Sequence, residues 1–173
     1  MKLAVIERMD YPEGKDIGKR FSMSRNYSGL LNELGVIVIP VITAYGIDQI
    51  AAFCDGLIIS GNALNILPCY YGKEALEGLN YDIDTYPLDK AAIEAFARLH
   101  KPILGICGGH QSINVYYGET LNQHIENHSL QEEQDHGLRL LKTHLLQTYL
   151  GKNRFVSIHC IPNASMQLHL TLR

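Results

Sequence analysis

Short apolar runs alternate along the chain with stretches whose apolar residues recur every three or four positions. The runs at residues 3–6, 36–42, 57–59 and 102–106 predict strands buried on both faces, as in a parallel sheet. The periodic stretches predict helices over residues 21–34, 47–53, 87–100 and 110–117. Strands that alternate with helices in this way predict an α/β fold, with a doubly wound, mostly parallel sheet and helices on both faces.

The remaining segments are less regular. Residues 7–19 and 60–84 are polar or irregular and are predicted to be loops, and long loops in compact domains are usually functional. The later part of the chain predicts strands at 137–141, 154–158 and 167–172 and a short helix at 143–150. No repeat or linker interrupts the chain, so residues 1–173 are expected to form a single domain.

Composition narrows the class of protein. Hydrophobic residues make up 46% of the chain and charged residues 19%, which is typical of a globular protein. A net charge of −3 gives no basic surface for nucleic acid, and no apolar run is long enough to cross a membrane. The four cysteines are scattered without a C-x-x-C pair, which argues against a disulfide framework and favours a reducing cytoplasm.

One cysteine lies where a buried strand is predicted to turn into a helix. Cys107 follows the apolar run 102–106, and Gly105, Gly108 and Gly109 surround it. Glycines permit a turn that a Cβ would obstruct, and such a turn holds the cysteine side chain above the sheet. A helix N-terminus beside the sulfur favours the reactive thiolate. The pattern therefore indicates a nucleophile elbow; the alternative is a buried structural cysteine in a tight turn.

The residues around Cys107 also resemble a motif of a known family. The sequence G-I-C-G-G-H-Q at 105–111 resembles the nucleophile elbow of class I glutamine amidotransferases, G-x-C-x-G-x-Q. Within that family it is similar to the γ-glutamyl-γ-aminobutyrate hydrolase type, peptidase C26, which continues through N-V into G-G-T-L, as residues 114–121 nearly do. An arginine often follows the cysteine in this type, and Gly108 stands there instead. Its third strand ends in P-G-G or P-G-S, and a proline and then Y-G follow further along. Gly61, Pro68 and Tyr71-Gly72 fall in register with that pattern, with Ser60 in the place of the first proline.

The resemblance implies a flavodoxin-like fold of the class I glutamine amidotransferase type and a thioester chemistry. Cys107 would attack a γ-glutamyl amide while the backbone amides of Gly61 and Gly108 hold the oxyanion. Gln111 and His159 would line the substrate pocket. The implied partner is a small γ-glutamyl compound, without cofactor, nucleic acid or membrane, and a homo-oligomer is left open.

A metal site is not expected. His124 and His128 lie four positions apart, a spacing that would place them on one face of a helix. Their segment has no apolar face, so it is predicted to be a solvated loop.

The family's general base is missing from this sequence. In peptidase C26 proteins it is the histidine of a late Q-x-H-P-E segment, oriented by the glutamate, and the chain contains no His-Pro-Glu. Gln167 to His169 echo only Q-x-H, and the leucine alternation there places His169 on the wet face of a strand. His159 is the other candidate base. The sequence thus predicts a C-terminally incomplete domain with impaired turnover; the alternatives are a non-catalytic binding protein and the glutaminase subunit of a synthase.

Overall fold

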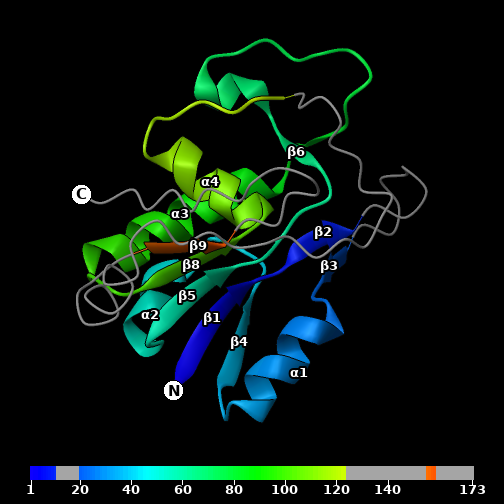
Figure 1. Cartoon of the computed structure of the whole chain (residues 1–173). Helices are drawn as coiled ribbons and strands as arrows, with labels where there is room; N and C mark the ends of the chain where they lie inside the picture. Colours follow the sequence, from blue (N-terminus) through cyan, green and yellow to red (C-terminus); the bar gives the residue numbers. More distant parts are fainter. Residues whose placement is uncertain (11–19, 124–154, 159–173) are drawn as a thin grey trace, which may run out of the picture.

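A computed structural model describes residues 1–10, 20–123 and 155–158 of the chain (Figure 1). Its centre is a five-stranded sheet in the order β4-β1-β5-β8-β9, and all four pairings in this sheet are parallel. The strands are β1 (Lys2–Ile6), β4 (Ile37–Val41), β5 (Gly56–Ile59), β8 (Ile103–Ile106) and β9 (Phe155–Ile158). Numbered along the chain, the order is 2-1-3-4-5, which is the flavodoxin-like order. The predicted fold class is confirmed.

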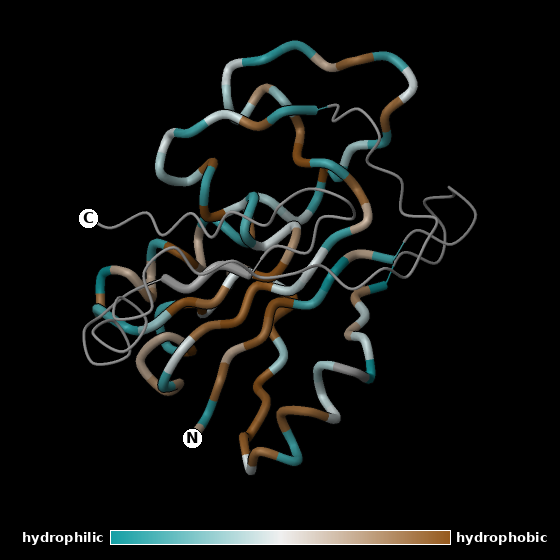
Figure 2. Tube along the Cα trace, viewed as in Figure 1, coloured by the Kyte–Doolittle hydropathy of each residue, from teal (hydrophilic) through white to brown (hydrophobic). Residues whose placement is uncertain are grey.

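Helices cover both faces of this sheet. We call one side the site face: there α2 (Ile47–Phe53), α3 (Thr85–Arg98) and α4 (Gly108–Tyr116) enclose the larger core cluster. On the other side, the α1 face, helix α1 (Arg25–Glu33) packs on a smaller cluster. Consecutive strand residues alternate between the two clusters, as Ala4 and Val5 do, because side chains of a strand point to opposite faces. The apolar strands lie together through the middle of the molecule in Figure 2.

The second strand was predicted to be buried on both faces, and this is wrong. β4 ends the described sheet on one side, and Ile37 and Ile42 are 58% and 51% exposed. The run at 36–42 is apolar enough for a central strand, but Pro40 has no N–H to donate to a further ladder and so suits an edge.

The first helix also begins later than the periodicity predicted. β2 (Arg8–Asp10) and β3 (Arg20–Ser22) form a small antiparallel pair in which Phe21 lies opposite Met9, so Phe21 belongs to a strand. The predicted loop 7–19 therefore begins with a strand. Helix α1 starts at Arg25, and Gly35 follows its end with φ 69°.

The other elements agree closely with their predictions. α2 has the predicted bounds, α3 begins two residues early, and α4 takes in both glycines after Cys107. The predicted loop 60–84 contains β6 (Asn65–Ile66), the 3₁₀ turn Pro68–Tyr71 and β7 (Tyr81–Asp82), which rise above α4 (Figure 1). β9 matches the predicted strand at 154–158, while the elements predicted at 137–141, 143–150 and 167–172 lie outside the described residues.

Candidate functional site

Cys107 adopts a backbone conformation that side-chain-bearing residues rarely take. It joins β8 to α4 with φ 50° and ψ −108°. A non-glycine residue at positive φ carries a steric cost of roughly 1–3 kcal/mol and is found where the surrounding structure enforces it, often at functional sites. The thiol is half-buried at the N-terminus of α4, at the carboxyl end of β8. This is the geometry of a nucleophile elbow.

The glycines around Cys107 allow α4 to pack directly on the strands. A Cβ at Gly109 would collide with the backbone carbonyl of Ile59, and one at Gly105 would lie 2.7 Å from the Gly109 carbonyl. A Cβ at Gly108 would lie 2.8 Å from the backbone nitrogen of Asn62. These are backbone contacts, so no side-chain rearrangement relieves them. The three glycines are therefore required by close approach, as the sequence pattern predicted.

Gly61, the first residue of the loop after Ser60, lies beside the cysteine. A Cβ on Gly61 would be 3.4 Å from the Cys107 Cβ, so the two residues are neighbours at the carboxyl ends of β5 and β8. The Gly61 N–H is directed at the Tyr27 hydroxyl, 3.4 Å away, from helix α1. Gly108 in turn packs closely against Asn62, the residue after Gly61, so the Gly61 loop contacts the start of α4 as well as Cys107. Gly61 and Gly108 thus both lie close to the nucleophile elbow, Gly61 beside Cys107 and Gly108 next to it in the chain.

The predicted substrate-pocket residues are only partly described. Gln111 is half-buried on α4, and its N–H donates to the Cys107 carbonyl at 3.2 Å in the first turn of the helix. His159 follows β9 but lies outside the described residues, as do His124, His128 and His169. Within the ranges 1–10, 20–123 and 155–158, no group of three His, Cys, Asp or Glu side chains is placed to hold a metal.

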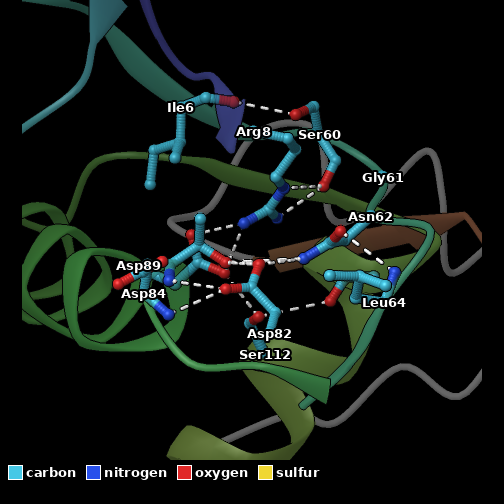
Figure 3. A network of polar contacts seen from close by, with 12 residues as sticks. Ile6, Arg8, Ser60, Gly61, Asn62, Leu64, Asp82, Asp84, Asp89 and Ser112 are labelled. Carbon is cyan, nitrogen blue, oxygen red and sulfur yellow. Dashed lines mark hydrogen bonds and ion pairs between the residues drawn. The ribbon is translucent and has the colours of Figure 1, made fainter. Parts of the chain in front are cut away.

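Next to the Gly61 loop lies a buried ionic network that the sequence did not predict (Figure 3). Arg8 of β2 donates through Nη1 to both carboxylate oxygens of Asp89 at 2.9 Å. Its Nε and Nη2 donate to the Ser60 carbonyl at 3.0 and 2.5 Å. The Ser112 hydroxyl of α4 lies 2.5 Å from Asp89, and Arg8 and Asp89 are only 8% and 1% exposed. Three elements and the Gly61 loop therefore meet at one buried guanidinium.

A second polar cluster adjoins the first. Asp82 accepts hydrogen bonds from the backbone N–H groups of Asp84 and Thr85, at 2.8 and 3.0 Å, and so caps the N-terminus of α3. The Thr85 hydroxyl and the Asn62 side-chain amide also donate to this carboxylate. A pocket of about 10 Å³, the space of one water molecule, lies among Arg8, Asn62, Asp82 and Gly108.

These surroundings shift the pKa values of the buried acids in opposite directions. Burial alone would raise the pKa of Asp82, but hydrogen bonds from Thr85, the Asp84 amide and Asn62 together lower it. For Asp89, burial raises the pKa, and the Arg8 charge and the Ser112 hydroxyl oppose this rise without cancelling it. Burial also raises the pKa of the Cys54 thiol, which has no exposed surface and lies in the apolar core. A buried thiol with a raised pKa is a poor nucleophile, so Cys54 is not a candidate for the reactive cysteine.

Comparison with known families decides the lineage. The sequence model of the family Peptidase C26 matches residues 7–168, nearly the whole chain, including the elbow and the Gly61 loop. The chain belongs to the peptidase C26 family. The class I glutamine amidotransferase-like lineage inferred from G-I-C-G-G-H-Q is thereby confirmed.

Individual relatives support this peptidase C26 assignment. The glutamine amidotransferase-like protein YvdE homolog of Lactococcus lactis subsp. cremoris is 35% identical over 107 residues, which cover 58% of this chain and 55% of that protein. YvdE of L. lactis subsp. lactis strain IL1403 is 32% identical over 62% of this chain and 46% of its own length. The glutamine amidotransferase-like protein RP404 of Rickettsia prowazekii is 30% identical over 62% of this chain and 39% of its own. The match thus spans about half the length of the first two relatives.

One solved structure is also similar. It is a GMP synthase subunit protein from Thermoplasma acidophilum, with 22% identity, a TM-score of 0.40, and coverage of 68% of this chain and 45% of that chain. Similarity at that level carries no argument about activity. Among the described residues of this peptidase C26 chain, no helix has the length and apolarity that crossing a bilayer requires.

Proposed function

We propose that this peptidase C26 chain hydrolyses γ-glutamyl amides, such as γ-glutamyl-GABA or glutamine-like compounds, through a thioester on Cys107. The observation that carries the proposal is the φ of 50° at Cys107, at a strand-to-helix corner beside Gly61. A buried structural cysteine gains nothing from such a conformation, whereas a nucleophile gains exposure above the sheet. Free thiols at Cys54 and Cys69 support a reducing compartment, and we place the protein in the cytoplasm.

The chemistry assigns one task to each group. The Cys107 thiolate attacks the γ-carbonyl carbon, and the C=O electron pair moves onto oxygen, where the Gly61 and Gly108 amides stabilise it. The C–N bond then breaks, and the amine leaves after taking up one proton. Water adds to the thioester, releases the glutamate γ-carboxylate and restores the thiol. Gln111 and His159 hold the γ-glutamyl group, and no cofactor takes part.

Two variants test this assignment. Hydrolysis of γ-glutamyl-GABA and of glutamine is measured on the native chain and on Cys107→Ala, with the exposed Cys69→Ala as the matched control. Loss of turnover in Cys107→Ala alone supports the proposal, and mass mapping should find the acyl group on Cys107. Unchanged turnover in Cys107→Ala would refute it.

The rate should be low, because the 173 residues contain no Q-x-H-P-E segment. General acid–base catalysis contributes about 10²–10⁴-fold, so we expect turnover slower by that factor than in relatives that carry the histidine and glutamate. Ordinary enzyme rates that vanish in His159→Ala would show instead that His159 is the base.

The same absence favours a second candidate function, a non-catalytic protein that binds small γ-glutamyl compounds. Such a protein would bind γ-glutamyl-GABA in calorimetry with similar affinity before and after Cys107→Ala, and would release no amine. If the chain were instead the glutaminase subunit of a synthase, it would hydrolyse glutamine only when the partner chain is present. Sedimentation of the chain alone and with ligand would show whether it assembles as a homo-oligomer.

A further inference from the structure

Arg8 hydrogen-bonds to the peptide group that carries the Gly61 N–H. The carbonyl of Ser60 and the N–H of Gly61 belong to one planar peptide unit, and the described residues contain no cis peptide bond. In a trans peptide these two groups point in opposite directions. Two donors of Arg8 hold the carbonyl, at 3.0 and 2.5 Å (Figure 3). They therefore also fix the direction of the N–H on the far side.

The nucleophile is a close neighbour of this peptide. The Gly61 N–H points toward the Tyr27 hydroxyl, and a Cβ on Gly61 would be 3.4 Å from the Cβ of Cys107. Without a Cβ, a glycine peptide rotates at little steric cost, so its direction has to be set by contacts. A peptide rotated by half a turn would present a carbonyl to the developing oxyanion and repel it.

Arg8 is itself held from two sides. Asp89 of α3 binds its Nη1 through both oxygens, and Ser112 of α4 donates to the same carboxylate. The Ser112 hydroxyl also lies 3.2 Å from the Gly108 carbonyl, but its single proton is best placed for the 2.5 Å contact with Asp89. The Ser60 hydroxyl is anchored separately, to the Ile6 carbonyl at 2.8 Å. A continuous buried path thus runs from helix α4 to the Gly61 peptide.

We propose that Arg8 is a positioning residue for acyl transfer at Cys107: its grip on the Ser60 carbonyl keeps the Gly61 N–H aimed at the oxyanion. This inference rests on the proposed function, since it assumes that Cys107 forms an acyl intermediate. It assigns the Arg8–Asp89 pair a role beyond folding. Removing one oxyanion donor typically costs 10²–10³-fold in rate, so a misdirected donor should cost a sizeable part of that.

Two reagents separate this role from a merely structural one. p-Nitrophenyl acetate acylates the thiolate through a tetrahedral oxyanion, and its p-nitrophenolate leaves without needing a proton. Iodoacetamide alkylates the same sulfur by displacement of iodide, with no oxyanion. The rate with each reagent is measured for the native chain and corrected by the rate of Cys107→Ala, which accounts for the other thiols.

Two variants and one control complete the experiment. Arg8→Lys keeps the charge but loses the fork that holds the Ser60 carbonyl, and Arg8→Met/Asp89→Leu removes the pair without leaving a buried charge unpaired. Arg20→Lys makes the same exchange at an exposed arginine of the neighbouring strand β3, outside the site, and is the matched control. We expect acylation to fall about 10–100-fold in both Arg8 variants, alkylation to change less than about twofold, and Arg20→Lys to behave as the native chain.

Acylation that stays at the native rate in a folded Arg8 variant would overturn the inference. So would equal losses of acylation and alkylation, because these would indicate a general disturbance of the thiol. A γ-glutamyl p-nitrophenyl ester, tested in parallel, examines the proposed function separately. If it fails to acylate the native chain while the acetate ester still distinguishes Arg8→Lys, the substrate class is wrong and the role of Arg8 stands. If neither ester acylates Cys107, both proposals fall.

Discussion

Helices α1 and α4 each contain glycine, but the two meet opposite surroundings. A Cβ on Gly29 of α1 would have nothing within 4 Å, whereas one on Gly109 of α4 would strike the Ile59 carbonyl. Two leucines give a similar pair of positions: Leu88 of α3 on the site face is 5% exposed, and Leu30, on the outward side of α1, is 59% exposed. The elbow helix α4 is thus packed on its strands to backbone contact at its glycine, whereas Gly29 of α1 faces open space. The position of Cys107 is therefore fixed by the contacts between α4 and the strands on the site face.

The strongest test of this contrast is a pair of identical changes. Gly109→Ala should destabilise the fold by about 4 kcal/mol or more, because the Ile59 carbonyl belongs to a central strand that cannot retreat. Gly29→Ala should instead stabilise it by about 0.5–1 kcal/mol, as alanine favours a helix over glycine. Urea unfolding of both variants measures the difference. Similar values for the two would show that the faces are equally packed.

A second pair compares leucines. Leu88→Ala should cost about 3 kcal/mol, since it empties a buried position in the core of the site face. Leu30→Ala should stay within about 0.5 kcal/mol of the native chain. Thermal unfolding of the two variants is sufficient, and a cost above about 2 kcal/mol for Leu30→Ala would mean that the α1 face is more tightly packed than its exposure indicates.

A third prediction concerns acid. The folded state lowers the pKa of Asp82 below its ordinary value of 3.8, so this carboxylate stabilises the fold above about pH 4 and loses that effect as the pH falls further. Asp82→Asn should cost about 1–2 kcal/mol at pH 7, and the gap to the native chain should narrow below pH 4. The matched control is the exposed Asp48→Asn. A gap that does not depend on pH would contradict the assignment.

The smallest effect is expected at the second Arg–Asp pair of the β2–β3 hairpin. Arg20 and Asp10 lie 3.1 Å apart with side chains 71% and 41% exposed, in contrast to the buried Arg8–Asp89 pair that starts from the same hairpin. Arg20→Gln should change the free energy of unfolding by less than about 1 kcal/mol, and less still at high salt. If Arg20→Gln destabilised the fold as much as breaking the Arg8–Asp89 pair does, the exposed and buried pairs would not differ in their contribution to stability.

Local patterns predicted much of this architecture. The glycines around Cys107 and the short helix α2 could be located from sequence because turn chemistry and helical periodicity act over a few residues. The exposure of β4 could not be predicted from sequence, because the position of a strand at the edge or in the centre of a sheet depends on how all the strands pair. Phe21 was assigned to a helix because its spacing fits one, yet its partner Met9 lies across a hairpin that local patterns do not reveal.

The buried network shows a different limit of sequence reading. Arg8 stands in a polar stretch that is typical of a loop, and Asp89 falls within a helix whose pattern is set by its apolar residues. They meet because β2 follows β1 and α3 begins at the carboxyl edge of the sheet, an arrangement that only the topology determines. An arginine two positions after a buried strand was the available signal. The roles of Gly61, Gly108, Gln111 and His159 remain predictions for the experiments described above.

The parallel sheet also has a consequence for how the protein is made. β8 pairs with β9, which lies about 50 positions later in the chain, and no hairpin can bring them together early. At a synthesis rate of about 5–20 residues per second, the ribosome leaves the apolar edge of β8 without this neighbour for roughly 3–10 s. Nascent chains expose that edge beside the half-built elbow. Chaperone demand during translation should therefore be highest between the emergence of β8 and that of β9.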